Sequence, residues 1–310
     1  MTDDTGERRT GGTYERPQGD LGGAREHDAF LRDRRLLFST AYHLLGSVAD
    51  AEDVLQDTWL RWARADRADV RHPTAYLVRT VSRLCLNRLT SARATRETYI
   101  GPWLPEPLLT GPDAADRTDT AHSVSMAMLV VLETLSPLER AVFVLREVFG
   151  YEYAEIAAAV ERAEPTVRQT AHRARAHIQA RRSRYDADDA TRAAVTEKFL
   201  AACAGGDLNA VLALLAPDVT AWSDGGGKVT AATRPLRGAD HVARWVLGVL
   251  GKPELAAITA APAAVNGRPG VLFTLHGAPA GALTFELAAG GRIHELRFQV
   301  NPDKLRGLSG

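Results

Sequence analysis

Seven arginines crowd the stretch between residues 162 and 184, where the opposing charge is a single carboxylate, Glu164. Arginine binds phosphate oxygens and can hydrogen-bond the edge of guanine with two parallel donors, so this stretch predicts binding to nucleic acid. A first helical pattern begins at Tyr153 and is separated from the arginine-rich one by a short break near Arg162. Two helices joined in this way, with the basic helix second, are typical of a helix-turn-helix unit, whose second helix enters the DNA major groove.

The second helical pattern has an apolar arc and a polar arc when its residues are placed at about 100° per residue. The apolar arc contains Val167, Ala171, Ala174 and Ile178, and the polar arc contains Gln169, His172 and Arg173, flanked by Arg168 and Arg175. We expect the apolar arc to pack on the preceding helix, through Ile156, Ala157 and Val160, and the polar arc to face DNA. Taken alone, the helix also fits a second interpretation, a solvated amphipathic surface helix.

The predicted turn departs from the usual pattern. Many such units have Gly in the turn and Ser as the N-cap of the second helix, and these places are held here by Glu161 and Ala163. Pro165 fits the first turn of a helix, where its missing N–H is harmless. A missing N-cap costs about 1 kcal/mol, which helix packing can offset.

A row of carboxylates occupies one face of an earlier helical pattern, at Asp50, Asp53 and Asp57. The opposite side carries the residues Ala51, Leu55, Thr58, Trp59 and Trp62. Such a row repels phosphate and suits a basic protein partner, although a solvated face of an ordinary helix is the alternative. The next helical pattern is basic and contains Arg71, Arg79, Arg83, Arg88, Arg93 and Arg96, with Tyr76 and Asn87. Two separated basic elements suggest one protein that contacts two DNA sites.

Charge must be read locally because the 310-residue chain is neutral, with 38 Lys and Arg against 38 Asp and Glu. Cys85 and Cys203 lie in apolar or alanine-rich surroundings and form neither a disulfide framework nor a zinc pattern, so we expect buried thiols in a reducing cytoplasm and no metal. No run of about 18 apolar residues exists, which excludes a transmembrane helix and predicts no membrane partner. The first 25 residues lack the apolar segment of a signal peptide.

The chain divides into five parts. Residues 1–26 form an expected disordered extension, 27–97 and 124–185 are helical, 98–123 form a linker rich in Pro and Gly, and 186–310 change character. In this last part a helix from Thr191 to Ala204 ends at Gly205, and short β-type runs follow, such as Gly270–His276, Ala282–Leu287 and Ile293–Val300. We therefore predict a multidomain chain, with two all-α domains and a C-terminal α+β domain.

Two blocks of sequence resemble a known family. FSTAYHLLGSVADAEDVLQDTWLRW (Phe38–Trp62) and HPTAYLVRTVSRLCLNRL (His72–Leu89) resemble the sigma-two domain of extracytoplasmic-function sigma factors. LSPLERAVFVLREVFGYEYAEIA (Leu135–Ala157), with the basic helix after it, resembles the sigma-four domain. These blocks cover about half of the chain, in the order and spacing of the family.

The resemblance implies a subunit that binds the RNA polymerase core, recognises promoter DNA and performs no bond chemistry, so no cofactor is expected. By this resemblance Asp50, Asp53, Gln56, Asp57 and Trp59 would dock on the clamp helices of the largest polymerase subunit, and the sigma-four domain would lie at the flap. Arg79, Arg83 and Asn87 would contact the −10 element, where unstacked bases are captured by protein pockets. Arg168, Gln169, His172 and Arg173 would contact the −35 element.

Three further motifs resemble the subgroup of these sigma factors that carries a fused, cone-like SnoaL-type C-terminal domain: WLPEP (Trp103–Pro107), DGGGK (Asp224–Lys228) and NPDKL (Asn301–Leu305). Our hypothesis is that the domain contacts the linker through these motifs and sets the distance between the two DNA-binding units. The expected contact residues are Trp103, Pro105, Asp224, Gly226, Lys228, Asn301 and Asp303. A fused regulator at high effective concentration would make a separate inhibitor unnecessary.

Two other functions stay open at this point. The glycine run before Lys228 fails as a P-loop, because Trp222 and Val229 stand where Gly and Ser or Thr are needed, and a tight turn is expected. SnoaL-like folds include enzymes with an acid–base pair in an apolar cavity, and the titratable candidates are Asp218, Asp224, His241, His276 and His294. Trp222, Trp245, Phe273 and Phe285 could line such a cavity or simply form core. A dimeric repressor is the other alternative, but it needs only one basic unit.

Overall fold

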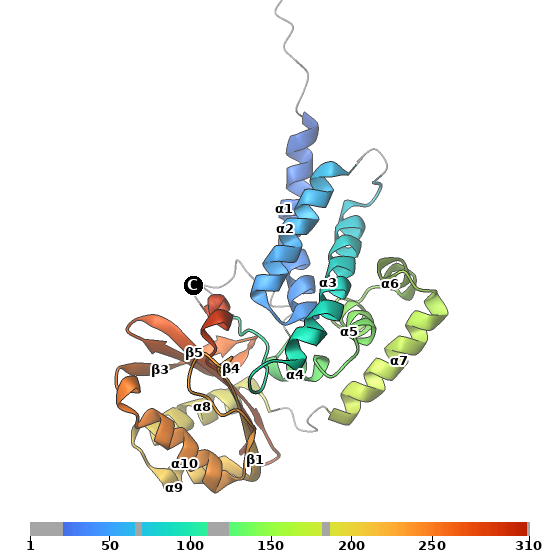
Figure 1. Ribbon diagram of the computed structural model, residues 1–310. Helices are drawn as coiled ribbons and strands as arrows, with labels where there is room; N and C mark the ends of the chain where they lie inside the picture. The colour runs from blue at the N-terminus through green and yellow to red at the C-terminus, as the bar shows by residue number, and fades with distance from the viewer. Residues whose placement is uncertain (1–20, 66–69, 111–123, 182–186, 309–310) are drawn as a thin grey trace, which may run out of the picture.

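The computed structural model describes residues 21–65, 70–110, 124–181 and 187–308. A helical region is followed by a C-terminal domain built on one sheet (Figure 1), which confirms the predicted fold class. The helical region contains α1 (Leu21–Leu45), α2 (Val48–Arg64), α3 (Pro73–Glu97), α4 (Met126–Leu132), α5 (Pro137–Phe143), a π-helical turn (Val144–Val148), α6 (Tyr153–Val160) and α7 (Glu164–Arg181).

Helix α1 begins at Leu21, so residues 21–26, which the sequence placed in the disordered extension, have a helical backbone. A helix that is already anchored by packing extends at little cost, because each added residue contributes one hydrogen bond. The anchor is the buried face that includes Phe30, Leu37 and Tyr42. Residues 1–20 of that extension lie outside the described residues.

Helix α2 starts where the sequence supplies a turn and a cap. Gly46 adopts a φ of 69°, and the Ser47 hydroxyl accepts a hydrogen bond from the backbone N–H of Asp50. Trp62 is buried at the other end of the helix, while Trp59 is half-buried and packs against Phe30 with ring centroids 5.2 Å apart. The predicted division of α2 into an apolar and an acidic face is confirmed.

The predicted helix-turn-helix is formed by α6 and α7. Its turn places Glu161 in the left-handed region, with a φ of 53°, at the position where Gly is usual. Helix α7 begins at Glu164, and its predicted apolar arc is buried, at Val167, Ala171, Ala174 and Ile178. Glu161 therefore adopts the left-handed conformation that Gly would adopt more readily, in a turn between two helices that the buried arc packs together.

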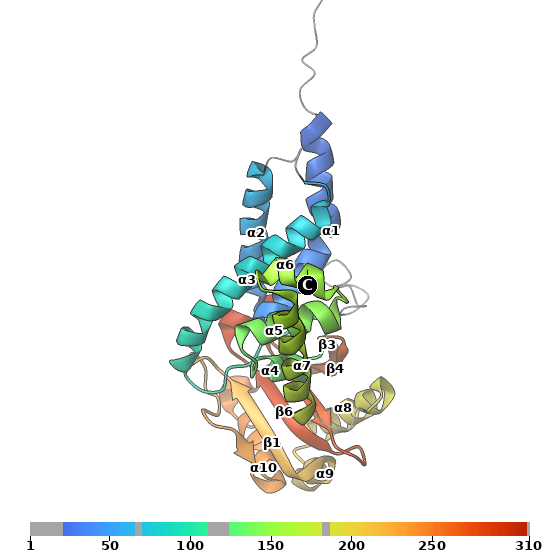
Figure 2. The same cartoon turned by 90° about the vertical axis from the view of Figure 1, so that its right-hand side faces the viewer.

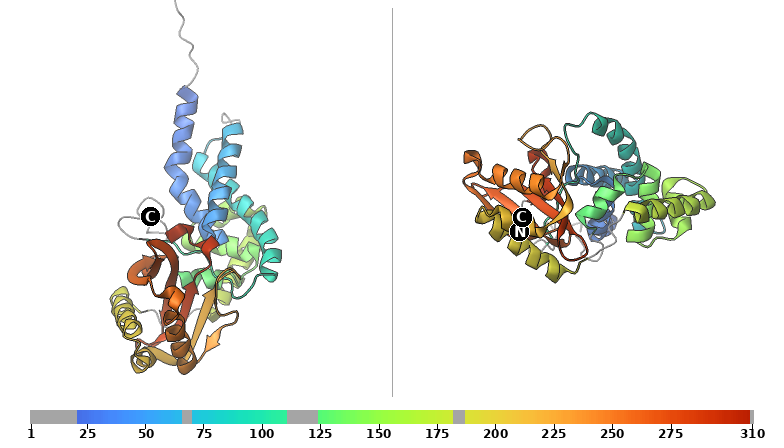
Figure 3. Two further views of the ribbon diagram at one scale, coloured as in Figure 1. Left: turned by 60° about the vertical axis from the view of Figure 1, so that its left-hand side comes forward. Right: turned by 90° about the horizontal axis from the view of Figure 1, so that it is seen from below.

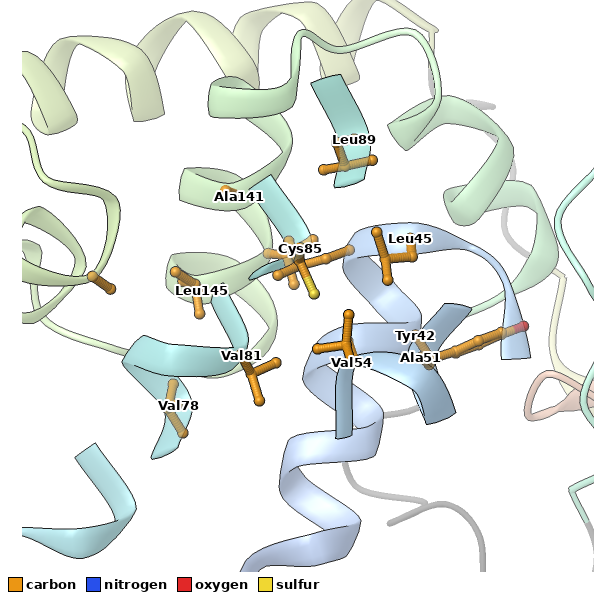
Figure 4. Packing of buried hydrophobic residues seen from close by; sticks show 14 of the residues in the cluster. Tyr42, Leu45, Ala51, Val54, Val78, Val81, Cys85, Leu89, Ala141 and Leu145 are labelled. Carbon is orange, nitrogen blue, oxygen red and sulfur yellow. The ribbon is translucent and has the colours of Figure 1, made fainter. Parts of the chain in front are cut away.

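The two helical domains predicted from the sequence share one hydrophobic core. Figure 4 shows Val78, Val81 and Cys85 of α3 packed against Ala141 and Leu145, which belong to the second helical domain. A buried arginine, Arg140, reaches across this junction and donates from Nε and Nη2 to the backbone oxygen of His43, at 3.4 and 3.3 Å. Burial lowers the pKa of its guanidinium, and an ion pair with Glu133 favours the charged form.

The C-terminal domain is a six-stranded sheet with helices on one face. Its helices are α8 (Asp189–Ala204), α9 (Leu208–Leu214) and α10 (Ala239–Leu250), and its strands are β1 (Leu215–Asp224), β2 (Leu236–Arg237), β3 (Ile258–Val265), β4 (Arg268–Leu275), β5 (Ala278–Leu287) and β6 (Ile293–Gln299). The strand order is β2-β1-β6-β5-β4-β3, and only the β1–β6 pair is parallel among these strands. Short 3₁₀ turns at Pro253–Leu255, Pro302–Lys304 and Arg306–Leu308 complete the domain.

The face of the sheet under α8, α9 and α10 holds the core of this domain. Trp245 of α10 meets Phe298 of β6 edge-on at 5.4 Å, and Phe298 stacks on Phe273 at 6.5 Å. These aromatic rings therefore form core. In the right-hand view of Figure 3 the sheet domain and α7 lie on opposite sides of the molecule.

Candidate nucleic-acid interface and linker contacts

Helix α7 presents the four residues that the sequence assigned to the −35 element on one exposed surface: Arg168, Gln169, His172 and Arg173. We call these four the recognition face. It lies opposite the buried apolar arc, and α7 itself runs along the edge of the molecule (Figure 1). A buried arc opposite an exposed polar and basic one is the arrangement that helices reading the DNA major groove present.

The residues assigned to the −10 element lie along α3. Arg79 and Asn87 are exposed, whereas Arg83 is half-buried and its Nη2 pairs with a carboxylate oxygen of Glu161 at 2.7 Å. Helix α6 packs beside this segment, and a shallow pocket between them is lined by Arg79, Glu155 and apolar side chains. The structure thus keeps the three residues on one helix but engages Arg83 with the turn of the second domain.

The acidic face of α2, formed by Asp50, Asp53 and Asp57, is paired internally. Nη1 of Arg88 lies 2.9 Å from Asp50 and 3.2 Å from Asp53, and Nη2 lies 4.0 Å from Asp57. Gln56 is exposed on the same helix. Trp59 is turned toward α1 instead, against Phe30.

Leu60 was missed by the sequence reasoning. It lies one helical turn after Gln56 and Asp57, and its side chain is 45% exposed. The sequence could have indicated Leu60, since it follows Asp53 by two helical turns and so lies on the same face of the helix.

The linker crosses the C-terminal domain over a fully buried carboxylate, Asp224. One oxygen of Asp224 accepts from the backbone N–H of Leu104 at 2.8 Å and from the ammonium group of Lys304 at 2.8 Å. The other oxygen accepts from the Tyr99 hydroxyl at 2.6 Å. The backbone oxygen of Leu104 accepts from Lys304 at 2.8 Å, and that of Pro105 from Gln299 at 3.2 Å.

The aromatic side chains of the linker surround the same ammonium group. Nζ of Lys304 lies 4.1 Å from the Trp103 ring centroid and 4.7 Å from that of Tyr99, distances at which the ring faces attract a cation. Desolvation and the hydrogen bond to Asp224 raise the pKa of the Tyr99 hydroxyl, so it stays a donor. Figure 2 shows the end of α3, which Tyr99 follows, running toward the region of β1.

The glycine run after Asp224 forms the expected turn, closed by a hydrogen bond from the Lys228 N–H to the Gly225 oxygen at 2.9 Å. Gly226 has a φ of 59°, and a Cβ there would lie 2.3 Å from Nδ2 of Asn301. This contact requires Gly both for its backbone angle and for space. Asn301 in turn donates to the Tyr99 hydroxyl at 2.8 Å.

All seven contact residues expected from the three motifs thus fall in one region, with Lys228 and Asp303 paired at 2.5 Å on its exposed side. Lys304 and Gln299 carry more of the buried contacts than that exposed pair, and the sequence reasoning had not singled them out. Lys304 lies inside NPDKL, so that motif could have indicated it. Tyr99 and Gln299 lie outside the three motifs, and no feature of the sequence indicated them.

The linker also binds the helical region. The carboxylate of Glu106 accepts from the Ser47 hydroxyl at 2.7 Å and from the Val48 N–H at 2.9 Å, at the first turn of α2. Burial raises the pKa of this carboxyl group. The buried Tyr42 hydroxyl donates to the Glu106 backbone oxygen at 2.6 Å and accepts from Asn266 of the C-terminal domain at 2.7 Å. The linker is therefore held from both sides.

The residues considered for an acid–base pair are dispersed. Asp224 is occupied by the linker, and His241 and His276 are exposed. Asp218 and His294 lie 3.6 Å apart, but their side chains are 77% and 39% exposed and line no apolar cavity that the structure describes. Among the described residues no cluster of His, Cys, Asp or Glu could hold a metal ion.

Comparison with known proteins decides the family. Residues 29–95 match the model of Sigma-70 region 2, and residues 125–178 match that of Sigma-70, region 4. The chain is 40% identical to the ECF RNA polymerase sigma factor SigJ of Mycobacterium tuberculosis over 287 residues, which cover 88% of this chain and 91% of SigJ. The chain belongs to the extracytoplasmic-function sigma factors.

A second relative and a solved structure of SigJ agree with this assignment. The probable ECF RNA polymerase sigma factor SigI of Mycobacterium tuberculosis is 34% identical over 290 residues, covering 91% of this sigma factor and 97% of SigI. The crystal structure of SigJ superposes with a TM-score of 0.71 at 36% identity, covering 92% of this chain and 98% of that one.

This sigma factor binds the RNA polymerase core and recognises promoters through its two helical domains, as the family does. Within the described residues, no helix has the length and apolar character needed to cross a membrane. The two helical domains are the parts of the chain that match the family models for Sigma-70 regions 2 and 4.

Proposed function

We propose that the C-terminal domain regulates this sigma factor from within the same chain, by fixing the linker between the two DNA-binding domains. The observation that carries the proposal is the buried Asp224 carboxylate, which binds the Leu104 N–H while Lys304 binds both that carboxylate and the Leu104 oxygen. Buried polar groups are costly unless they are paired, so these bonds form or break together. In this proposal the linker has a held state, in which these bonds are formed as in the structure, and a released state, in which they are broken.

The held state couples to the helical domains through Glu106 and Tyr42. Glu106 caps the first turn of α2, and Tyr42 joins α1 to Asn266. Release of Leu104 and Pro105 from the C-terminal domain would disturb this junction, because these residues directly precede Glu106. In this proposal the C-terminal domain acts on that junction and so adjusts the separation of the −10 and −35 readers, which the shared core of the two helical domains also constrains. An inhibitor on a separate chain is unnecessary in this scheme, and the protein acts in the cytoplasm, where polymerase and promoter lie.

Specific side chains carry the contacts to polymerase and promoter in this proposal. Asp50, Asp53, Gln56, Asp57 and Trp59 dock on the clamp helices of the largest polymerase subunit, with Leu60 added as an exposed apolar contact. The second helical domain lies at the flap. Arg79, Arg83 and Asn87 contact the −10 element, and the recognition face contacts the −35 element. The exposure of the recognition face and the carboxylate row on α2 support these assignments.

Transcription from the cognate promoter with purified core polymerase tests the regulatory role. We compare the full chain with a deletion of residues 301–310 and with the point variant Lys304→Met, and we use Lys198→Met as the control because Lys198 is exposed on α8 and belongs to none of the three motifs. The deletion and Lys304→Met should change transcript output in the same direction, and the control should leave it unchanged. Output that stays equal in all four proteins would refute regulation through the linker.

Fluorescent labels on α2 and α7 provide a second measurement. Lys304→Met should broaden the distribution of distances between the two labels, because the linker is no longer held. A distribution identical to that of the unmodified chain would mean that the linker contacts do not set the separation of the two readers.

A further inference from the structure

The ring of Tyr153, at the first turn of α6, lies between two guanidinium groups. The Cζ atom of Arg168 is 4.5 Å from the ring centroid, and that of Arg146 is 4.7 Å away. The Tyr153 hydroxyl also accepts a hydrogen bond from Nη2 of Arg175 at 3.1 Å. One aromatic side chain thus organises three arginines in the helix-turn-helix unit.

Arg146 and Arg175 are occupied by groups from other segments of this unit. Arg146 donates to the backbone oxygen of Tyr151 at 2.8 Å, and Nε of Arg175 donates to Glu147 at 2.8 Å. The Glu147 carboxylate and the Tyr153 hydroxyl both stabilise the charged form of Arg175, whose pKa is raised first by the hydrogen bond to Glu147 and next by that to Tyr153. These two arginines serve the fold.

Arg168 differs because its side chain is 60% exposed on the recognition face. Its Nε and Nη2 both contact one oxygen of Glu164, one turn earlier on the same helix, at 3.0 and 2.5 Å. The Cζ atom of the same guanidinium group lies over the Tyr153 ring. Glu164 and Tyr153 together fix the direction of the group and leave the Nη1–Nη2 edge for an acceptor outside the protein.

We propose that Tyr153 is a positioning residue for DNA recognition, which acts by holding Arg168 ready for an acceptor oxygen or nitrogen of the duplex. The inference rests on the proposed function, since it presumes that the recognition face meets the −35 element. An arginine fixed before binding loses less side-chain freedom in the complex, and this saving corresponds to about 3- to 10-fold in affinity. The acceptor is either a phosphate oxygen or the edge of guanine.

The experiment measures binding of the full chain, assembled with core polymerase, to a duplex that carries the −35 element. The variants are Tyr153→Leu, Tyr153→Phe, Arg168→Gln and the double variant Tyr153→Leu with Arg168→Gln. Tyr153→Phe retains the ring and loses the hydroxyl, so it separates the contact with Arg168 from that with Arg175. Arg244→Gln is the control for removal of an exposed arginine, since Arg244 pairs with Asp240 on α10.

We expect Tyr153→Leu to weaken binding about 3- to 10-fold and Tyr153→Phe to restore most of the affinity. In the Arg168→Gln background, Tyr153→Leu should have almost no further effect on DNA binding, because the two residues act as a unit. A purely structural role would instead lower affinity equally in both backgrounds, and that additive result would overturn the inference. Binding of Tyr153→Phe as weak as that of Tyr153→Leu would overturn it as well.

Two controls keep this result distinct from failure of the proposed function. If Arg168→Gln and variants at Gln169 and Arg173 all bind as the unmodified chain does, the recognition face itself is wrong, and the proposed −35 contact fails together with this inference. If those variants weaken binding and Tyr153→Leu does not, only the inference about Tyr153 fails. Salt titration then identifies the acceptor, because loss of a phosphate contact lowers the salt slope by about one and weakens binding to all sequences alike.

Discussion

The ammonium nitrogen of Lys304 lies 2.8 Å from the carboxylate of Asp224, and both side chains are buried where the linker crosses the C-terminal domain. The same carboxylate binds the backbone N–H of Leu104. A buried pair of this kind is costly to assemble, and it is damaging to break because one charge is then left without its partner. This pair therefore makes the linker contact sensitive to single substitutions.

Removal of the cation should destabilise the C-terminal domain. Lys304→Met is expected to lower the free energy of unfolding by about 3 kcal/mol, since the buried Asp224 carboxylate loses its cationic partner. The double variant Lys304→Met with Asp224→Asn should recover part of this loss, because the buried charge is gone. Urea unfolding monitored by tryptophan fluorescence measures both. Equal stability of Lys304→Met and the unmodified chain would show that the pair is accessible to water.

The turn at Gly226 should tolerate no side chain. Gly226→Ala requires both a positive φ and the displacement of Asn301, whereas Gly206→Ala, at a similar φ of 62°, has no heavy atom within 4 Å of its new Cβ. We expect Gly206→Ala to lower the free energy of unfolding by about 1 kcal/mol and Gly226→Ala by clearly more. Thermal denaturation of the two variants compares backbone strain alone, in Gly206→Ala, with backbone strain plus a steric clash with Asn301, in Gly226→Ala. Matching losses would mean that Asn301 moves aside freely.

Glycine at position 161 should relieve strain in the turn. Glu161 has a φ of 53°, so Glu161→Gly removes a penalty of about 1–2 kcal/mol for the left-handed conformation. Two effects offset this gain: Gly has greater freedom in the unfolded chain, and the half-exposed ion pair with Arg83 is lost. The net expectation is a gain of roughly 0.5 kcal/mol in the free energy of unfolding. Glu161→Gln retains the strain and loses the ion pair, and it should be slightly less stable. Differential scanning calorimetry distinguishes the two, and a loss of stability in the Gly variant would contradict this reasoning.

The acidic face of α2 should become a stronger electrostatic target when Arg88 is removed. Arg88→Gln leaves Asp50, Asp53 and Asp57 without their shared cation, so binding to core polymerase should depend more steeply on salt. The free energy of unfolding should fall by less than about 1 kcal/mol, because the pairs are partly exposed. Arg34→Gln, which breaks an exposed pair with Glu52, is the matched control. An unchanged salt slope for Arg88→Gln would exclude these carboxylates from the polymerase interface.

The order of the domains and the character of their faces followed from the sequence alone. Local chemistry is sufficient for this: the spacing of Val167, Ala171, Ala174 and Ile178 marks a buried helix face whatever lies beneath it. The residues of α2 and α7 proposed to contact polymerase and DNA were assigned through the resemblance to sigma factors, and their contacts stay predictions. The start of α1 was not predictable, because Gly22 and Gly23 disfavour a helix locally, whereas the backbone continues a helix that packing anchors further along the chain.

The partners of those residues were decided by the tertiary structure. Tyr99, Gln299 and Lys304 meet Asp224 from positions 125, 75 and 80 residues away, and no periodicity records such a distance. The pairing of Arg83 with Glu161 likewise depends on how α3 packs against α6. A sequence determines which side chains must be buried or exposed, through the hydrophobic effect. Which buried polar groups satisfy one another is settled only when the chain has folded and water has been excluded around them.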